Sequence, residues 1–169
     1  MFSIVGVSAF LPFVPMLPIQ ILLNNLLYDL SQSAIPADNV DPEWIQQPRR
    51  WDIANLLRFI LAIGPVSSIF DYATFFILLS VFGASTQPAL FHTAWFIESI
   101  FSQILVIHVI RTTKIPFLQS MASWQLSLAS LAVLALATWL TVSPLASTLG
   151  FVALPGNYWL ILAGLLLTY

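Results

Sequence analysis

The chain alternates between long apolar segments and short breaks rich in proline or polar residues. The apolar segments lie at residues 1–13, 18–35, 56–82, 92–110, 124–143 and 157–169. A helix rises 1.5 Å per residue, so crossing about 30 Å of hydrocarbon takes about 20 apolar residues. The four middle segments are about this long, and the shorter first and last segments predict partial helices. The pattern predicts an all-α membrane protein, a polytopic bundle of transmembrane helices.

Composition supports this class and excludes several others. The chain has 59% hydrophobic and 7% charged residues, whereas soluble domains have about 25% charged residues. Its net charge of -2 gives no basic surface for nucleic acid, so we expect no nucleic-acid partner. With no cysteine, it has no disulfide, thiolate nucleophile or cysteine-ligated metal. A soluble catalytic domain does not fit beside the apolar segments.

The segment 36–52, PADNVDPEWIQQPRRWD, predicts a solvent-facing loop because its prolines and charges need water or partners. Asp52 is the predicted start of the next helix, with Asn55 as the alternative. All basic residues lie near this loop or after the fourth apolar segment: Arg49, Arg50, Arg58, Arg111 and Lys114. Positive charge favours the cytoplasmic side, so we expect both regions there.

Two polar residues in the second apolar segment form a candidate metal site. Asp29 lies 11 residues after Pro18, which is about 16 Å along a helix, and Asn25 lies one turn before it on the same face. Carboxylate and amide oxygens suit Mg²⁺ or Ca²⁺. The alternative is that both residues bond to neighbouring helices or that Asp29 stays hydrated near the headgroups. The prolines upstream favour the metal site, because proline frees backbone carbonyls.

Two further acids lie inside apolar segments, where an unpaired charge is costly. Glu98 is the third candidate metal ligand. Asp71 could contact an ion or accept hydrogen bonds from Ser67, Ser68 or Tyr72. The two histidines lie near opposite ends of the fourth segment and cannot share a metal. The predicted metal site therefore consists of Asn25, Asp29 and Glu98, with no catalytic or cofactor-binding residue.

Several stretches resemble the C-terminal transmembrane part of magnesium-translocating P-type ATPases. They are LPFVPMLPIQILLNNLLYDLSQSAIPADNVDPEWIQQPRRWD, IGPVSSIFDYATFF, HTAWFIESIFSQILVIHVIRTTKIPF and SPLASTLGFVALP. NLLYD, residues 25–29, resembles the N-L-x-x-D pattern of the sixth helix of that family. The resemblance implies a chain that runs from the end of the fifth helix to the start of the tenth. It also implies that Asn25 and Asp29 contribute cation ligands.

The resemblance further implies ATP-driven uptake of Mg²⁺ across the bacterial inner membrane. The chain lacks the DKTGT and TGES motifs and a nucleotide-binding domain, so it is not expected to hydrolyse ATP alone. ATP would act only through domains absent from this chain, which we expect to be a fragment, a truncated product or half of a split gene. Expected partners are the lipid bilayer, Mg²⁺ and the missing N-terminal part of the pump. Two alternatives stay open: a small stand-alone membrane protein that regulates a pump, and a secondary cation transporter.

Overall fold

A computed structural model describes residues 2–39, 53–112, 114, 116, 117 and 119–169. The α-helices are α1 (Phe2–Ser8), α2 (Pro18–Gln32), α4 (Ile53–Ser80), α5 (Pro88–Ile110), α6 (Trp124–Val142) and α7 (Gly156–Thr168). A short 3₁₀ helix, η1 (Ile35–Ala37), follows α2. This all-helical architecture confirms the predicted fold class. Most of the predicted 36–52 loop, including Asp52, lies outside the described residues, and α4 begins at Ile53, so Asn55 lies within the helix and does not start it.

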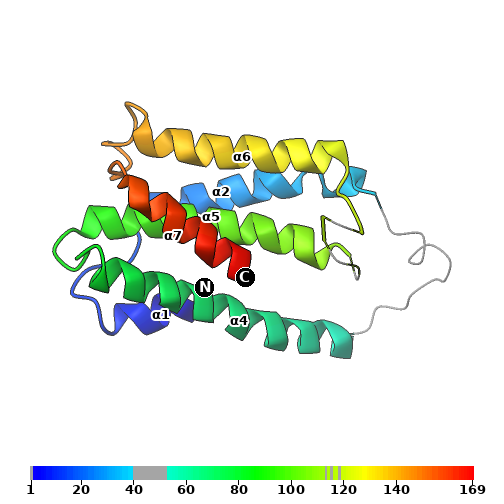
Figure 1. Cartoon of the computed structure of the whole chain (residues 1–169), viewed down its shortest axis with the longest axis horizontal. Coiled ribbons are helices and arrows are strands. Elements are labelled where there is room, and N and C mark those ends of the chain that lie inside the picture. The colour runs from blue at the N-terminus through cyan, green and yellow to red at the C-terminus, as the bar shows by residue number, and fades with distance from the viewer. Residues whose placement is uncertain (1, 40–52, 113, 115, 118) are drawn as a thin grey trace.

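Helix α5 is the centre of the bundle. It packs against α2 and α6 on one side and against α4 on the other, while α7 crosses over it (Figure 1). Residues 90–98 of α5 are all buried. Trp95 packs edge-on against Phe75 of α4 with ring centroids 4.8 Å apart, and the Tyr158 hydroxyl of α7 donates to the Ala94 carbonyl at 2.6 Å. Contacts of this kind fix the neighbouring helices around α5.

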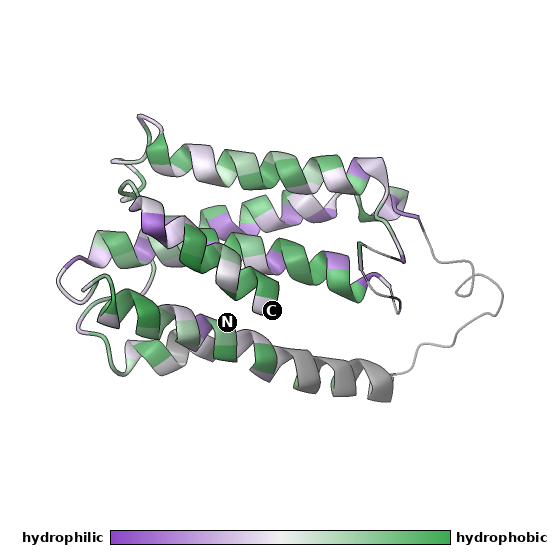
Figure 2. Cartoon of the chain, viewed as in Figure 1, coloured by the Kyte–Doolittle hydropathy of each residue, from purple (hydrophilic) through white to green (hydrophobic). Residues whose placement is uncertain are grey.

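The outward surface of the bundle is apolar. Figure 2 shows hydrophobic residues along α5, α6 and α7, and many large apolar side chains on outer faces are exposed, among them Phe76, Leu131, Trp139 and Leu160. Among the described residues, α5 and α6 are long and apolar enough to cross a membrane, whereas Gly64–Ser80 and α7 are apolar but shorter. A large exposed apolar surface of this kind marks contact with a membrane.

The start of α2 is anchored by hydrogen bonds to distant turns. Gln20 accepts from the Leu17 backbone N–H at 3.1 Å and donates to the Leu149 carbonyl at 2.9 Å. The Cβ of any other residue at Gly150 would lie 2.7 Å from a Leu17 methyl carbon, and Gly150 has a φ of +72°. His92 of α5 donates to the Val14 carbonyl at 2.6 Å. These contacts hold the proline-rich corner before α2 and thereby set the position of α2 in the bundle.

Candidate cation site

Helix α2 has two different polar faces. Its buried residues recur at helical spacing and face the bundle: Gln20, Asn24, Leu27 and Ser31. Asn25 and Asp29 are both exposed. They lie one helical turn apart, so their side chains are neighbours on that exposed face. The structure therefore brings the predicted pair together on the face of α2 that is turned away from the helices of this chain.

Two backbone carbonyls next to the prolines upstream of α2 already accept hydrogen bonds. The Val14 carbonyl accepts from His92, and the Leu17 carbonyl accepts from the backbone N–H groups of Gln20 and Ile21. Pro18 is the first residue of a regular helix that continues to Gln32, because proline at that position removes a donor that the helix leaves unbonded anyway. Our expectation that these prolines open the backbone for a cation is wrong for these two carbonyls.

Glu98 lies in a separate polar group inside the bundle. Its residue is 3% exposed, and its Oε2 atom has no hydrogen-bond partner. The Asp71 carboxyl group of α4 lies within interaction range of it. Two carboxylates at such short range in a low-dielectric interior repel each other unless a proton or a cation lies between them. The pair can therefore hold positive charge inside the bundle.

The hydrogen-bond partners of Asp71 differ from those that we expected. Ser3 of α1 donates to Asp71 Oδ2 at 2.5 Å, and Trp95 Nε1 of α5 donates to Oδ1 at 3.3 Å. Ser67 instead shares a hydrogen bond with Tyr169, and Ser68 donates to the Gly64 carbonyl of its own helix. The prediction of local serine partners was wrong, because the rotation of α4 turns Asp71 toward α1 and α5.

The predicted ligands differ in burial, because Asn25 and Asp29 are exposed whereas Glu98 is buried. Within the described ranges, no group of three or more His, Cys, Asp and Glu side chains lies close enough to hold a metal ion. Asp29 lies on the exposed face of α2, whereas Glu98 is 3% exposed beside Asp71. The structure therefore contains two polar pairs. Asn25 and Asp29 lie on the outer face of α2, and Glu98 and Asp71 lie in the bundle core.

Asn24 is a further candidate that was not among the predicted ligands. It is 0% exposed, and both its amide nitrogen and its amide oxygen lack hydrogen-bond partners. Buried polar groups are normally bonded, and an orphaned group in a membrane bundle marks a place for a partner or an ion. The signal was available in the sequence, because Asn24 lies at helical spacing from Gln20, Leu27 and Ser31.

An ion pair anchors the opposite end of α2. Arg111, just after α5, contacts Asp38, which follows η1, at 2.6 Å. Asp38 also accepts from the Ser123 backbone N–H at 2.7 Å. Burial acts to raise the pKa of Asp38, but hydrogen bonds from Arg111, Ser123 and Asn39 and the guanidinium charge together hold this pKa below its ordinary value. The sequence reasoning used Arg111 only to orient the chain and missed this role.

Carboxyl and amide groups inside a bundle of apolar helices are typical of a functional site in a membrane protein. The family described as "Cation transporting ATPase, C-terminus" matches residues 13–169. The chain belongs to this family. The predicted resemblance to the C-terminal membrane region of P-type ATPases is thereby confirmed.

The relatives are much longer than this chain. The chain is 52% identical over 169 residues to "Magnesium-transporting ATPase, P-type 1" of Escherichia coli strain K12. This match covers 96% of this chain and 19% of that protein. A protein of the same name from Salmonella typhimurium strain 14028s is 51% identical over 164 residues, or 95% of this chain and 18% of that protein. The chain therefore spans about a fifth of the length of the curated relatives it matches.

Proposed function

We propose that the chain forms the C-terminal membrane part of an ATP-driven Mg²⁺ transporter of the bacterial inner membrane. The pairing of Asn25 and Asp29 on the outward face of α2 carries this proposal, because carboxyl and amide groups of membrane helices normally face other protein groups or water rather than lipid. The relatives named as magnesium-transporting ATPases support Mg²⁺ as the ion. ATP would act through the parts of such a pump that this chain does not match.

Asn25 and Asp29 would contribute different ligands to the ion. Asp29 supplies negative charge and Asn25 supplies a neutral oxygen. Mg²⁺ requires near-octahedral oxygen ligands at about 2.0–2.1 Å and retains several water molecules. The remaining positions would be filled by water and by oxygen atoms from other helices of the pump that face α2. Transport then requires the affinity of this site to differ between the two conformations of the pump.

Glu98 would act at a second position, inside the bundle. Its unpartnered Oε2 atom lies in the core beside the Asp71 carboxyl group, so a cation could replace a proton between the two acids. A cation near α5 would be attracted there and would relieve the repulsion between the two acids. The separation of this pair from Asp29 favours two positions along one path over a single site with three ligands.

A chimaera tests the proposal directly. The matching C-terminal segment of the Escherichia coli relative is replaced by this chain, and Mg²⁺-stimulated ATP hydrolysis is measured in purified protein. Asp29→Asn should abolish the stimulation, and Asn25→Ala should weaken it. Ser33→Ala is the matched control, because Ser33 is exposed one turn beyond Asp29 and the substitution removes only its hydroxyl group, which donates to the Leu30 carbonyl. The control should retain the stimulation of the unmodified chimaera.

Three results would overturn the proposal. Unchanged Mg²⁺ stimulation in the Asp29→Asn chimaera removes Asp29 from the site. Mg²⁺ flux through this chain alone in liposomes, driven by an ion gradient without ATP, identifies a secondary transporter. Copurification of the chain with a complete, independently active pump identifies a regulator.

A further inference from the structure

Asn24 lies on the inner face of α2, which packs against α5 and α6. The buried residues of this inner face are Gln20, Asn24, Leu27 and Ser31. Gln20 donates to the Leu149 carbonyl at 2.9 Å, and Ser31 donates to the Tyr28 carbonyl at 2.7 Å. Neither amide atom of Asn24 has a hydrogen-bond partner in the part of the chain that the structure describes, and neither is accessible to a water molecule. Among the polar side chains of this face, the Asn24 amide is therefore the unbonded one.

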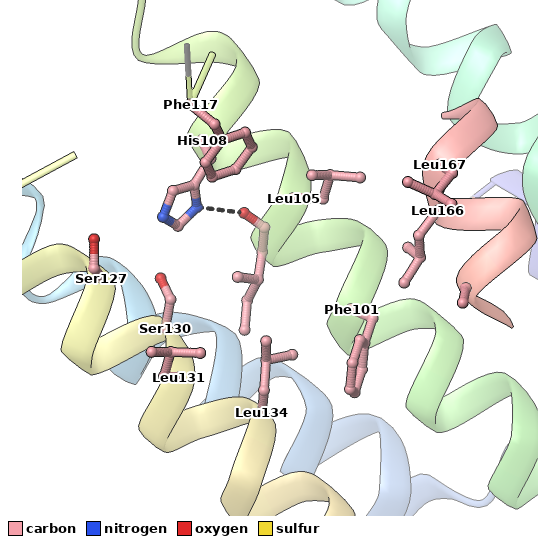
Figure 3. Close-up of a pocket in the computed structure, with 12 residues that line it drawn as sticks. Phe101, Leu105, His108, Phe117, Ser127, Ser130, Leu131, Leu134, Leu166 and Leu167 are labelled. Atoms are coloured by element: carbon pink, nitrogen blue, oxygen red, sulfur yellow. Dashed lines mark hydrogen bonds between the residues drawn. The ribbon is translucent and has the colours of Figure 1, made fainter. Parts of the chain in front are cut away.

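The surroundings of Asn24 do not supply the missing partner in this conformation. The cavity of about 600 Å³ beside α6 is lined by residues of α5, α6 and α7 and by Phe117, and by none of α2 (Figure 3). Ser130 at its wall is also unbonded. A hydroxyl group can rotate onto a carbonyl of the preceding helical turn, as Thr138 does with Leu134 at 2.8 Å. The Asn24 amide has two N–H donors and an acceptor oxygen, so one local bond of that kind does not satisfy it.

The unbonded amide raises the free energy of this packing of α2. Water or another polar group would bond the same amide, so a movement of α2 that gives Asn24 a partner recovers this cost. Polar contacts at both ends of α2 oppose such a movement. Gln20 holds the start of the helix to the Leu149 carbonyl, and Asp38, which follows η1, pairs with Arg111 at 2.6 Å. The middle of α2 is therefore destabilised while both of its ends are held.

We propose that Asn24 is a positioning residue that keeps α2 able to move away from α5 and α6. Its amide is unbonded in the described conformation and gains a partner when α2 moves. Leucine has the same branching at Cγ without polar atoms, so leucine at this position would hold α2 in place. This role rests on the proposed function, because a movement of α2 carries Asn25 and Asp29 with it and changes the affinity of their site.

Thiol labelling measures how often α2 moves away from its neighbours. The chain contains no cysteine, so Ser31→Cys places a single thiol on the inner face, where Ser31 is 0% exposed. In nanodiscs, a water-soluble maleimide reacts with this thiol only when α2 has moved, so the labelling rate follows the moved fraction. Asn24→Leu should slow the labelling at least about fivefold, which corresponds to about 1 kcal/mol for the unbonded amide.

Gln20→Leu is the matched control on the same face. Gln20 is as buried as Asn24, but its amide is bonded to Leu149, so this substitution should speed the labelling of Ser31→Cys. Thr74→Cys reports opening of the bundle elsewhere, because Thr74 is buried on α4, on the other side of α5. Its labelling should be the same with and without Asn24→Leu. Circular dichroism checks that each variant is folded, and Asn24→Met replaces Asn24→Leu if that variant unfolds.

The chimaera connects this movement to transport. Asn24→Leu should lower the maximal rate of ATP hydrolysis at saturating Mg²⁺, because α2 is held in one conformation. Unchanged or faster labelling of Ser31→Cys in the Asn24→Leu variant would overturn the role of Asn24, and so would equal slowing at Thr74→Cys. Slower labelling with an undiminished maximal rate would overturn its part in transport. A chimaera that Mg²⁺ does not stimulate would contradict the proposed function alone, because the labelling does not depend on transport.

Discussion

Arg111 and Asp38 form an ion pair with 2.6 Å between Nε and Oδ2, and their side chains are 8% and 11% exposed. The pair joins the end of α5 to the segment after α2, although the two residues are 73 positions apart. Arg111 also donates to the Met121 carbonyl at 2.9 Å. Asp38 also accepts from the backbone N–H of Ser123, the residue before α6, so this one ion pair connects α2, α5 and α6 at the same end of the bundle.

Removing one partner of this ion pair should destabilise the bundle strongly. Arg111→Met leaves the Asp38 carboxylate largely buried without its counter-charge, which costs about 3 kcal/mol of unfolding free energy. Arg111→Lys keeps the positive charge but lacks the planar guanidinium group, so it should lower the unfolding free energy by less than Arg111→Met does. Unfolding of the chain in mixed micelles, followed by circular dichroism, measures both values. Equal stability of Arg111→Met and the unmodified chain would show that the pair does not hold these helices together.

The same pair predicts how stability depends on pH. The pKa of Asp38 is lower in the folded chain than its ordinary value of 3.8, so the folded state binds this proton less readily than the unfolded state. Its contribution is therefore complete above the ordinary pKa and is lost as the pH falls through the lowered folded pKa. Asp38→Asn should remove this part of the acid dependence. Unfolding curves of both proteins across the acid range provide the measurement, and parallel pH profiles would contradict the prediction.

Gly150→Ala should destabilise the connection between α2 and the turn before α7. The residue has a φ of +72°, and an added Cβ would lie 2.7 Å from a Leu17 methyl carbon, so we expect a loss of about 1–2 kcal/mol. Gly64→Ala is the matched control, because an added Cβ there meets nothing within 4 Å. Alanine is the better helix former, so the control should be neutral or stabilised by up to about 1 kcal/mol. Thermal unfolding distinguishes the two outcomes.

Glu98→Gln should affect the stability of the folded chain and the activity of the chimaera differently. The variant removes one of two neighbouring acids in the core, so unfolding free energy should stay equal or rise. Mg²⁺-stimulated ATP hydrolysis in the chimaera should fall, because an amide cannot release a proton and offer a negative charge to the cation. Ser80→Ala, which removes only a bond to the Phe76 carbonyl of its own helix, is the control. A Glu98→Gln chimaera with undiminished activity would assign Glu98 a structural role alone.

The sequence alone determined that the protein is a bundle of membrane helices and which family it resembles. Helix existence and limits follow from local properties, since apolar length matches the hydrocarbon thickness and prolines and polar residues end each segment. Helix α6, for example, begins and ends within one residue of the predicted segment 124–143. The neighbouring positions of Asn25 and Asp29 also follow from helical spacing alone.

Only the tertiary structure decided which polar groups meet. Asp71 accepts hydrogen bonds from Ser3 and Trp95 on other helices. Asn24 rather than Asn25 faces the bundle. Arg111 forms an ion pair with Asp38. In a soluble helix the apolar face marks the interior, but in a membrane both lipid and neighbouring helices are apolar. Hydrophobicity therefore does not specify the rotation of each helix. That rotation is set by side-chain packing between helices, and it determines which carboxyl and amide groups lie inside.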